Sequence, residues 1–131
     1  MTESHNNPEN HGIEISVKPA YLADQSHPGN NRYVFSYTIT ITNQGSENAK
    51  LISRYWHIVD GNGKVQEVQG VGVVGEQPHL IPGQSYTYTS GAILETDTGT
   101  MEGHYIMQRD DAASFQVEIP VFALVTPAKL H

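Results

Sequence analysis

The sequence predicts an all-β fold, an antiparallel β sandwich of about seven strands with an immunoglobulin-like or fibronectin type III-like outline. Three observations favour this class. Apolar and polar residues alternate with a period of two, the intervening segments are rich in turn-forming residues, and no segment combines an apolar pattern of helical period with a helix cap. A closed β barrel is the alternative that the same pattern allows.

The clearest strand covers residues 33–42, where aromatic residues and isoleucines alternate with serine and threonine from position 36 onward. A turn-forming cluster follows at 43–48, and residues 49–59 then read as a second long strand. We expect these two strands to form a hairpin. The strongest turn signal is Asp-Gly-Asn-Gly at 60–63, which leads into a strand at 65–68.

Further strands are expected at 13–17, 85–90, 101–109 and 115–125, the last one broken or bulged at Pro120. The lone tryptophan, Trp56, suits the space between two packed sheets. We expect a disordered N-terminal tail over residues 1–11 and one domain over residues 12–131.

Composition limits the classes of function. In 131 residues, 7 Lys and Arg face 14 Asp and Glu, a net charge of −7 that disfavours nucleic acid as a partner. The absence of cysteine excludes disulfides and thiol chemistry. The N-terminus does not resemble a secretory signal and no apolar run could cross a bilayer, so we expect a cytoplasmic protein without membrane insertion.

Residues 70–75 match the G-x-G-x-x-G pattern that holds a pyrophosphate at a helix N-terminus in dinucleotide-binding proteins. Two prolines and a glycine within 76–83 prevent a helix from starting there. A structural loop is the favoured interpretation, and a backbone site for a small anion is the alternative. The candidate anion or ligand residues are Gly70, Gly72, Gly75, Glu76 and Arg54.

Metal binding and catalysis find less support. Seven histidines include no His-x-His pair, and structural or surface roles are favoured for the three weak metal candidates, His57, His79 and His104. An acidic cluster of Glu95, Asp97 and Glu102 around the turn at Gly99 is interpreted as a solvated patch. Because the G-x-S-x-G and H-E-x-x-H motifs are absent, we expect no enzymatic activity.

A protein partner is the leading hypothesis. Exposed aromatic side chains often dominate interfaces, and Tyr55 and Trp56 are the candidate interaction residues. Core packing is the alternative role for such side chains. Edge strands of an open sandwich could also pair between two chains and give a homodimer.

Several segments together resemble the bacterial ApaG family. The resemblance is carried by residues 51–63 and 70–78, by Pro82-Gly83, and by residues 88–91 and 103–105. It implies a fibronectin type III-like sandwich and a physiological link to cobalt resistance and magnesium efflux, with cobalt or magnesium as the divalent cation. A similar domain is appended to eukaryotic F-box and polymerase-interacting proteins, which implies a recognition module. The family's G-x-G-x-x-G falls on Gly70, Gly72 and Gly75 and implies a nucleotide or pyrophosphate ligand, and no catalytic residues carry over.

Overall fold

The computed structural model describes residues 3–5 and 10–129, and its regular structure is almost entirely β. Short 3₁₀ turns within these residues include η2 (Ala23–Gln25), η3 (Pro28–Asn30) and η4 (Pro127–Lys129). The strands are β1 (Glu3–His5), β2 (Ile13–Tyr21), β3 (Tyr33–Asn43), β4 (Ala49–Asp60), β5 (Val65–Val71), β6 (His79–Leu80), β7 (Ser85–Leu94), β8 (Thr98–Gln108) and β9 (Ser114–Val125).

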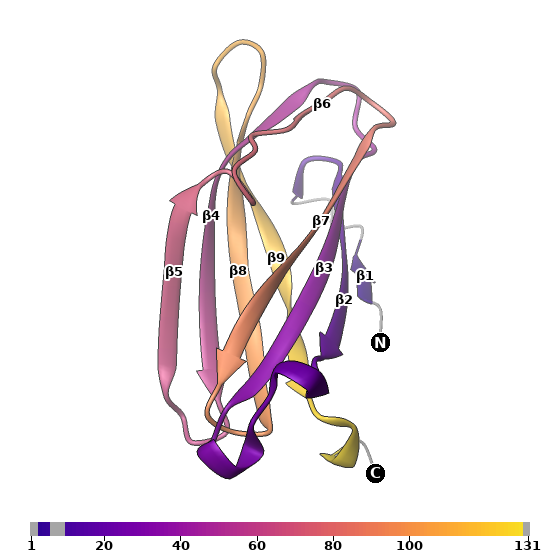
Figure 1. The fold of residues 1–131 in the computed structure, drawn as a ribbon. Helices are drawn as coiled ribbons and strands as arrows, with labels where there is room; N and C mark the ends of the chain where they lie inside the picture. The colour runs from indigo at the N-terminus through magenta and orange to yellow at the C-terminus, as the bar shows by residue number, and fades with distance from the viewer. Residues whose placement is uncertain (1–2, 6–9, 130–131) are drawn as a thin grey trace.

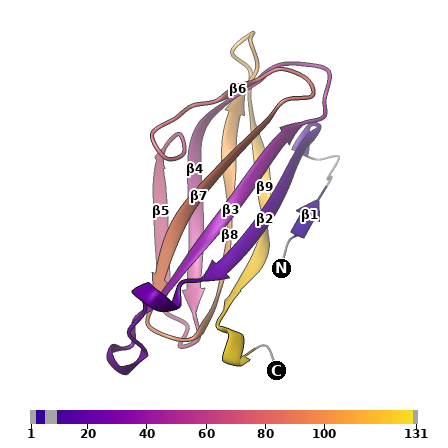
Figure 2. The ribbon, with the colours of Figure 1, turned by 45° about the vertical axis from the view of Figure 1, so that its right-hand side comes forward.

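The strands form two layers (Figure 1, Figure 2). The four-stranded sheet has the order β1-β2-β3-β7, and the five-stranded sheet has the order β5-β4-β8-β9 with β6 added beside β4. All pairings are antiparallel. The predicted fold class, an antiparallel β sandwich with an immunoglobulin-like or fibronectin type III-like outline, is therefore confirmed. In residues 3–5 and 10–129, no helix is long and apolar enough to cross a membrane.

The hairpin of β4 and β5 is built around the predicted turn. The Asp60 amide donates to the Lys64 carbonyl at 3.0 Å, and the Gly63 amide donates to the Asp60 carbonyl at 3.0 Å. The Asp60 carboxylate accepts from the Asn62 and Lys64 amides at 2.8 and 3.0 Å. Gly63 has a φ of 82°, a conformation that favours glycine. The local sequence therefore determines this reversal, as expected.

The predicted hairpin between residues 33–42 and 49–59 is wrong. Strand β3 pairs with β2 and β7 in the four-stranded sheet, whereas β4 lies between β5 and β8 in the five-stranded sheet. The connecting residues 44–48 carry the chain from one layer to the other. This crossing lets the apolar faces of both strands meet across the core, which a flat hairpin could not do.

The core lies between the two sheets and is centred on Trp56, whose side chain is 1% exposed. The Trp56 ring packs edge-on against Tyr37 of the opposite sheet at 5.2 Å and against Phe122 of β9 at 5.9 Å between centroids. Strand β9 is bulged at the predicted place. Its register with β8 shifts between Met101 and Gly103, opposite Pro120.

The predicted disordered tail over residues 1–11 falls partly outside the described residues. In the described part, β1 pairs with β2, and Asn10 is buried against β9. Within the expected tail, the described residues therefore contact the sandwich through β1 and through Asn10. The division into a disordered tail over residues 1–11 and one domain over residues 12–131 stays a prediction.

Candidate functional site

Strand β5 leads into residues 70–76, here called the glycine turn. Gly72, Val74 and Gly75 have positive φ values of 66°, 43° and 82°. Val73 and Glu76 bridge each other as an antiparallel pair, so Val74 and Gly75 form a tight reversal between them. The next element along the chain is the short strand β6. The sequence argument against a dinucleotide-binding helix at this position is thus confirmed.

Arg54 reaches the glycine turn from β4. Its Nη1 donates to the Gly72 carbonyl at 3.0 Å and lies 3.4 Å from the Val71 carbonyl. A Cβ added at Gly70 would lie 2.6 Å from the same Nη1, so a side chain there would displace the guanidinium from this position. The Arg54 guanidinium therefore contacts the carbonyl oxygens of the turn and lies against Gly70.

Several backbone amides of the glycine turn are already used within the protein. The Gly72 amide donates to the Ile52 carbonyl at 2.8 Å, and Val73 and Glu76 exchange amide-to-carbonyl bonds at 2.8 Å in both directions. An anion nest needs free amides that converge on one point. The structure brings together all five residues predicted for a ligand site, and it uses most of their polar groups to hold the turn. These five residues are Gly70, Gly72, Gly75, Glu76 and Arg54.

A second candidate is the outer face, defined as the side of the five-stranded sheet turned away from the core. Tyr55 and His57 of β4 lie on it beside Glu102 and His104 of β8. Their neighbours on the adjacent strands are Glu67 of β5 and Glu118 of β9. The strand register places these residues together because cross-strand partners project to the same side of a sheet.

Tyr55 and His104 are the centre of the outer face. Their rings stack with centroids 5.1 Å apart and an interplanar angle of 27°. The Tyr55 hydroxyl donates to Glu67 Oε2 at 2.6 Å, and this bond is the largest cause that raises the Tyr55 pKa. The stacked pair forms part of a shallow hollow of about 300 Å³. The hollow is lined by Tyr55, His57, Glu102, Gly103, His104, Glu118 and Ile119.

Of the two aromatic residues predicted for an interaction surface, the structure places one on the outer face. Tyr55 is half-buried there, while the prediction for Trp56 is wrong because its side chain is in the core. Consecutive residues of a strand point to opposite faces, so Tyr55 and Trp56 cannot share a surface. The sequence did not reveal Glu67 and Glu118, whose position depends on which strands pair.

The three weak metal candidates are not brought together. His57 and His104 lie on the outer face, whereas His79 begins β6 and lies 3.1 Å from Asp110 Oδ1. That hydrogen bond, followed by one from Asn48 at 2.7 Å, lowers the Asp110 pKa. Among the residues that the structure describes, no group of three or more His, Cys, Asp or Glu has a geometry that could hold a metal ion.

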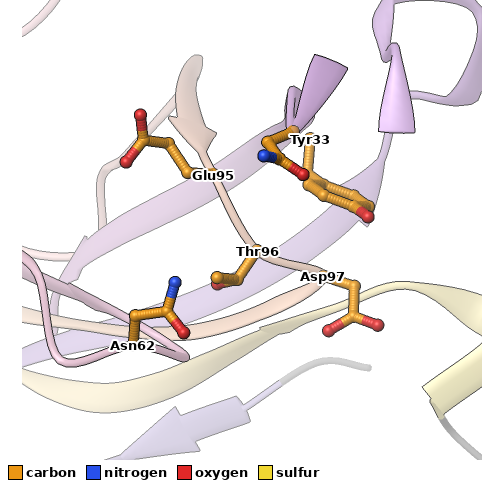
Figure 3. A pocket seen from close by; sticks show the side chains of 6 residues that line it. Tyr33, Asn62, Glu95, Thr96 and Asp97 are labelled. Atoms are coloured by element: carbon orange, nitrogen blue, oxygen red, sulfur yellow. The ribbon is translucent and has the colours of Figure 1, made fainter. Parts of the chain in front are cut away.

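The predicted acidic cluster is divided in the structure. Glu95 and Asp97 lie in the β7–β8 connection beside a polar hollow of about 400 Å³, while Glu102 belongs to the outer face. Figure 3 shows the Glu95 and Asp97 carboxylates at opposite sides of this hollow. Glu95 accepts a hydrogen bond from Lys64 at 3.0 Å. The two carboxylates therefore do not converge on a common point.

The protein is therefore an antiparallel β-sandwich domain. One sheet face is open and partly aromatic, and the glycine turn is held by hydrogen bonds within the chain. Comparison with known proteins identifies the family. The family model described as the ApaG domain matches residues 23–109, and the chain belongs to the ApaG family.

Relatives and solved structures agree with this assignment. The chain is 53% identical to Protein ApaG of Aromatoleum aromaticum over the full length of both chains. It is 56% identical to Protein ApaG of Brucella canis over 116 residues, which cover 88% and 89% of the two chains. A crystal structure described as ApaA from Bordetella pertussis superposes with a TM-score of 0.86 at 49% identity and covers 88% of this chain and 94% of that one. The name Protein ApaG states no activity.

Proposed function

We propose that this chain is a non-enzymatic, cytoplasmic binding module that contacts a protein partner through the outer face of its five-stranded sheet. The observation that carries the proposal is the Tyr55–His104 stack, which presents a preorganised aromatic surface on an open sheet. Aromatic side chains held in place by neighbours lose little conformational freedom on binding and often provide much of the binding energy.

The charges around the stack indicate the chemistry of the partner. Glu67, Glu102 and Glu118 surround Tyr55 and His104, and the whole chain has a net charge of −7. A partner surface with Lys or Arg at its rim would complement these carboxylates. Nucleic acid fits this face poorly because its phosphates would be repelled.

The test is affinity capture with immobilised full-length wild type, two outer-face variants and one control variant. Tyr55→Ala and His104→Ala remove the stack from the outer face, and Thr89→Ala changes an exposed residue of the opposite sheet as a matched control. We expect a reproducible partner that wild type and Thr89→Ala retain and that both outer-face variants lose. A partner that all four proteins capture equally would refute this face as the binding site.

Binding of phosphate, pyrophosphate or a nucleotide at the glycine turn is the second candidate function. The feature in its favour is the Arg54 guanidinium beside Gly70. The measurement is an NMR titration with millimolar-range inorganic pyrophosphate. Displaced amide signals of Gly70, Gly72 and Gly75 would support the site, and unchanged signals would show that the turn is only structural.

Cobalt or magnesium homeostasis is the proposed physiological setting, and it comes from family resemblance alone. Direct binding of a divalent cation by His57 and His104 is testable by calorimetry with Co²⁺ and Mg²⁺. Binding to the native state must raise the melting temperature as the metal concentration increases. A melting temperature that does not change would remove direct metal binding and leave the setting to be explained through the protein partner.

A further inference from the structure

Strand β5 forms one margin of the five-stranded sheet. It pairs with β4 on one side, and no strand among the described residues pairs with its other side. Figures 1 and 2, two views that differ by 45°, both show β5 at the border of the molecule. Such an edge presents backbone donors and acceptors in a row, which is a template for another strand.

The hydrogen-bond pattern shows which residues of β5 face this edge. The Asp60 amide donates to the Lys64 carbonyl, and the Gly72 amide donates to the Ile52 carbonyl. In an antiparallel pair, every second residue bonds to the neighbouring strand, so the even-numbered residues of β5 bond to β4. The amides and carbonyls of the odd-numbered residues point away from the sheet. These residues are Val65, Glu67, Gln69 and Val71, and the Val71 carbonyl already lies 3.4 Å from Arg54 Nη1.

Other margins of the sandwich carry features that limit further pairing. At β9, the Asn10 side chain donates to the Glu118 carbonyl at 3.0 Å and accepts from the Glu118 amide at 2.9 Å. The β2 edge is partly covered by β1. On β7, the Ile93 carbonyl accepts from the Gln66 side chain at 3.2 Å. Each margin therefore has backbone groups that are already occupied.

Strand β5 lacks several of the devices that usually protect an edge, and Glu67 is its one charged residue. Its seven residues include no proline and no lysine, and its register with β4 shows no bulge. Three valines are exposed on it, including Val71 at 74%. An edge that is apolar in part and has a regular register is suited to pairing with a second strand.

We propose that two copies of this chain form a homodimer by antiparallel pairing of their β5 strands around a two-fold axis at Val68. The proposal goes beyond the binding-module function and does not depend on it. In this register, Val65 lies opposite Val71 of the second copy, and Glu67 lies opposite Gln69 of the second copy. The occupant of the edge is therefore a second copy of the chain itself.

The sequence of β5 favours this register in two ways. The outward amides and carbonyls of Glu67 and Gln69 meet outward carbonyls and amides of the second copy, because odd-numbered residues lie opposite odd-numbered residues. Each Glu67 carboxylate meets an amide side chain, whereas a shift that places Glu67 opposite its own copy would oppose two like charges. The order Val-Gln-Glu-Val-Gln-Gly-Val places valine at the centre and at both ends, which suits the self-complementarity that a two-fold interface requires.

Dimerisation would change the binding surface. A two-fold axis perpendicular to the sheet joins the two five-stranded sheets into one and keeps both outer faces on the same side. Two Tyr55–His104 stacks would then face a partner together, which increases the effective affinity for any partner with two matching sites.

Sedimentation equilibrium over micromolar to millimolar concentrations tests the dimer, since a single pair of strands gives a small interface. Gln69→Lys places a cation opposite Glu67 of the second copy and should tighten the dimer. Gln69→Glu places a negative charge opposite Glu67 of the second copy and should weaken the dimer. Each of these two variants should change the dimer Kd by roughly two- to thirtyfold, because the contact between positions 67 and 69 occurs twice in the dimer. Gln69→Pro removes an outward amide without breaking the bond pattern to β4 and should give a monomer.

Matched controls separate the β5 edge from general effects. Thr100→Lys and Thr100→Glu make the same kind of change in net charge on the outer face of β8, which β4 separates from β5. Thr89→Pro places proline at the β7 edge. We expect the dimerisation constant of all three controls to match wild type. A wild-type protein that stays monomeric at every concentration would overturn the proposal. A dimer that is lost in Thr89→Pro but unchanged in the Gln69 variants would also overturn it.

Hydrogen exchange gives an independent readout on the unmodified protein. The Glu67 and Gln69 amides should become protected as the protein concentration rises, while the Val68 amide, which faces β4, should be protected at every concentration. Equal protection of the Glu67 and Gln69 amides at low and high concentration would count against β5 pairing.

Discussion

Gly103 shows how closely β8 approaches β4. It lies opposite Trp56 in the register, next to the place where β9 is bulged. A Cβ at this position would overlap the Tyr55 carbonyl oxygen. Because that oxygen belongs to the backbone of the central strand, it cannot move aside without disturbing the strand pair that carries the Tyr55–His104 stack.

Gly103→Ala should therefore destabilise the protein by about 3 kcal/mol, as overpacking of a rigid site does. Chemical denaturation measures the loss. Gly29→Ala is the control, because nothing lies within 4 Å of a Cβ at position 29, and its effect should stay within about 0.5 kcal/mol. Equal unfolding midpoints for the two variants would show that the sheet adapts to a side chain at position 103.

The alternation rule predicts side-chain direction when it is applied residue by residue. Once Trp56 is assigned to the core, the same rule sends Tyr55 to the opposite face, and a surface that contains both is excluded. The position of Glu67 and Glu118 on the same face could not be predicted from a single sequence. It depends on β5 and β9 lying on either side of the β4–β8 pair, and local patterns do not specify strand neighbours.

The glycine turn was predictable for a different reason. Prolines after residue 75 exclude a helix, and glycine tolerates the positive φ values found at positions 72 and 75. The role of Arg54 as a donor to the turn carbonyls depends on the pairing of β4 with β5. Candidate residues could thus be named from the sequence, whereas their hydrogen-bond partners required the structure.

At the scale of elements, Asn10 acts as a substitute strand partner for β9. Its side-chain amide makes both hydrogen bonds that a neighbouring strand would make with Glu118, and it is 2% exposed. Asn10→Ala should lower stability by about 1–2 kcal/mol because two backbone groups lose their partner. Chemical denaturation gives this value, and hydrogen exchange at the Glu118 amide should become faster.

The comparison variant for this prediction is Asn48→Ala. Asn48 also makes a side-chain hydrogen bond, to Asp110, but this bond is exposed to solvent. Its loss should change stability little, because water replaces the partner. An Asn10→Ala variant that keeps the wild-type exchange rate at Glu118 would show that Asn10 does not protect the β9 edge.

Element positions followed closely from the sequence, and element pairing did not. Period-two patterns locate β3 and β4 because each strand buries alternate residues, whichever sheet it joins. The connection between β3 and β4, residues 44–48, was compatible with a hairpin and with a crossing between layers. Only the packing of both apolar faces against a common core decides between them, and that is a property of the whole chain.

At the scale of the whole molecule, Tyr88 and Tyr105 join the two sheets. Tyr88 belongs to β7 and Tyr105 to β8, and their hydroxyl oxygens are 2.5 Å apart in the core. Burial is the main cause that raises the pKa of both phenols, and it also raises the pKa of nearby Tyr37. Ionising any of them would place a negative charge between the sheets.

Stability should therefore decrease at alkaline pH. The unfolded chain releases tyrosine protons near the ordinary pKa of 10.0, while the folded chain retains them because its tyrosine pKa values are raised. The contribution of these protons is complete below that pKa and is lost as the pH rises through the higher folded values. Denaturant titrations from about pH 9 to about pH 11, on either side of the ordinary value, would measure the decrease.

The double variant Tyr88→Phe, Tyr105→Phe identifies the source of this pH dependence. Replacing both hydroxyls removes the pair without leaving an unpaired polar group, so stability at neutral pH should change by no more than about 1–2 kcal/mol. The slope of unfolding free energy against pH above the ordinary tyrosine pKa should become shallower. Equal slopes for wild type and the double variant would show that groups other than Tyr88 and Tyr105 cause the loss of stability at alkaline pH.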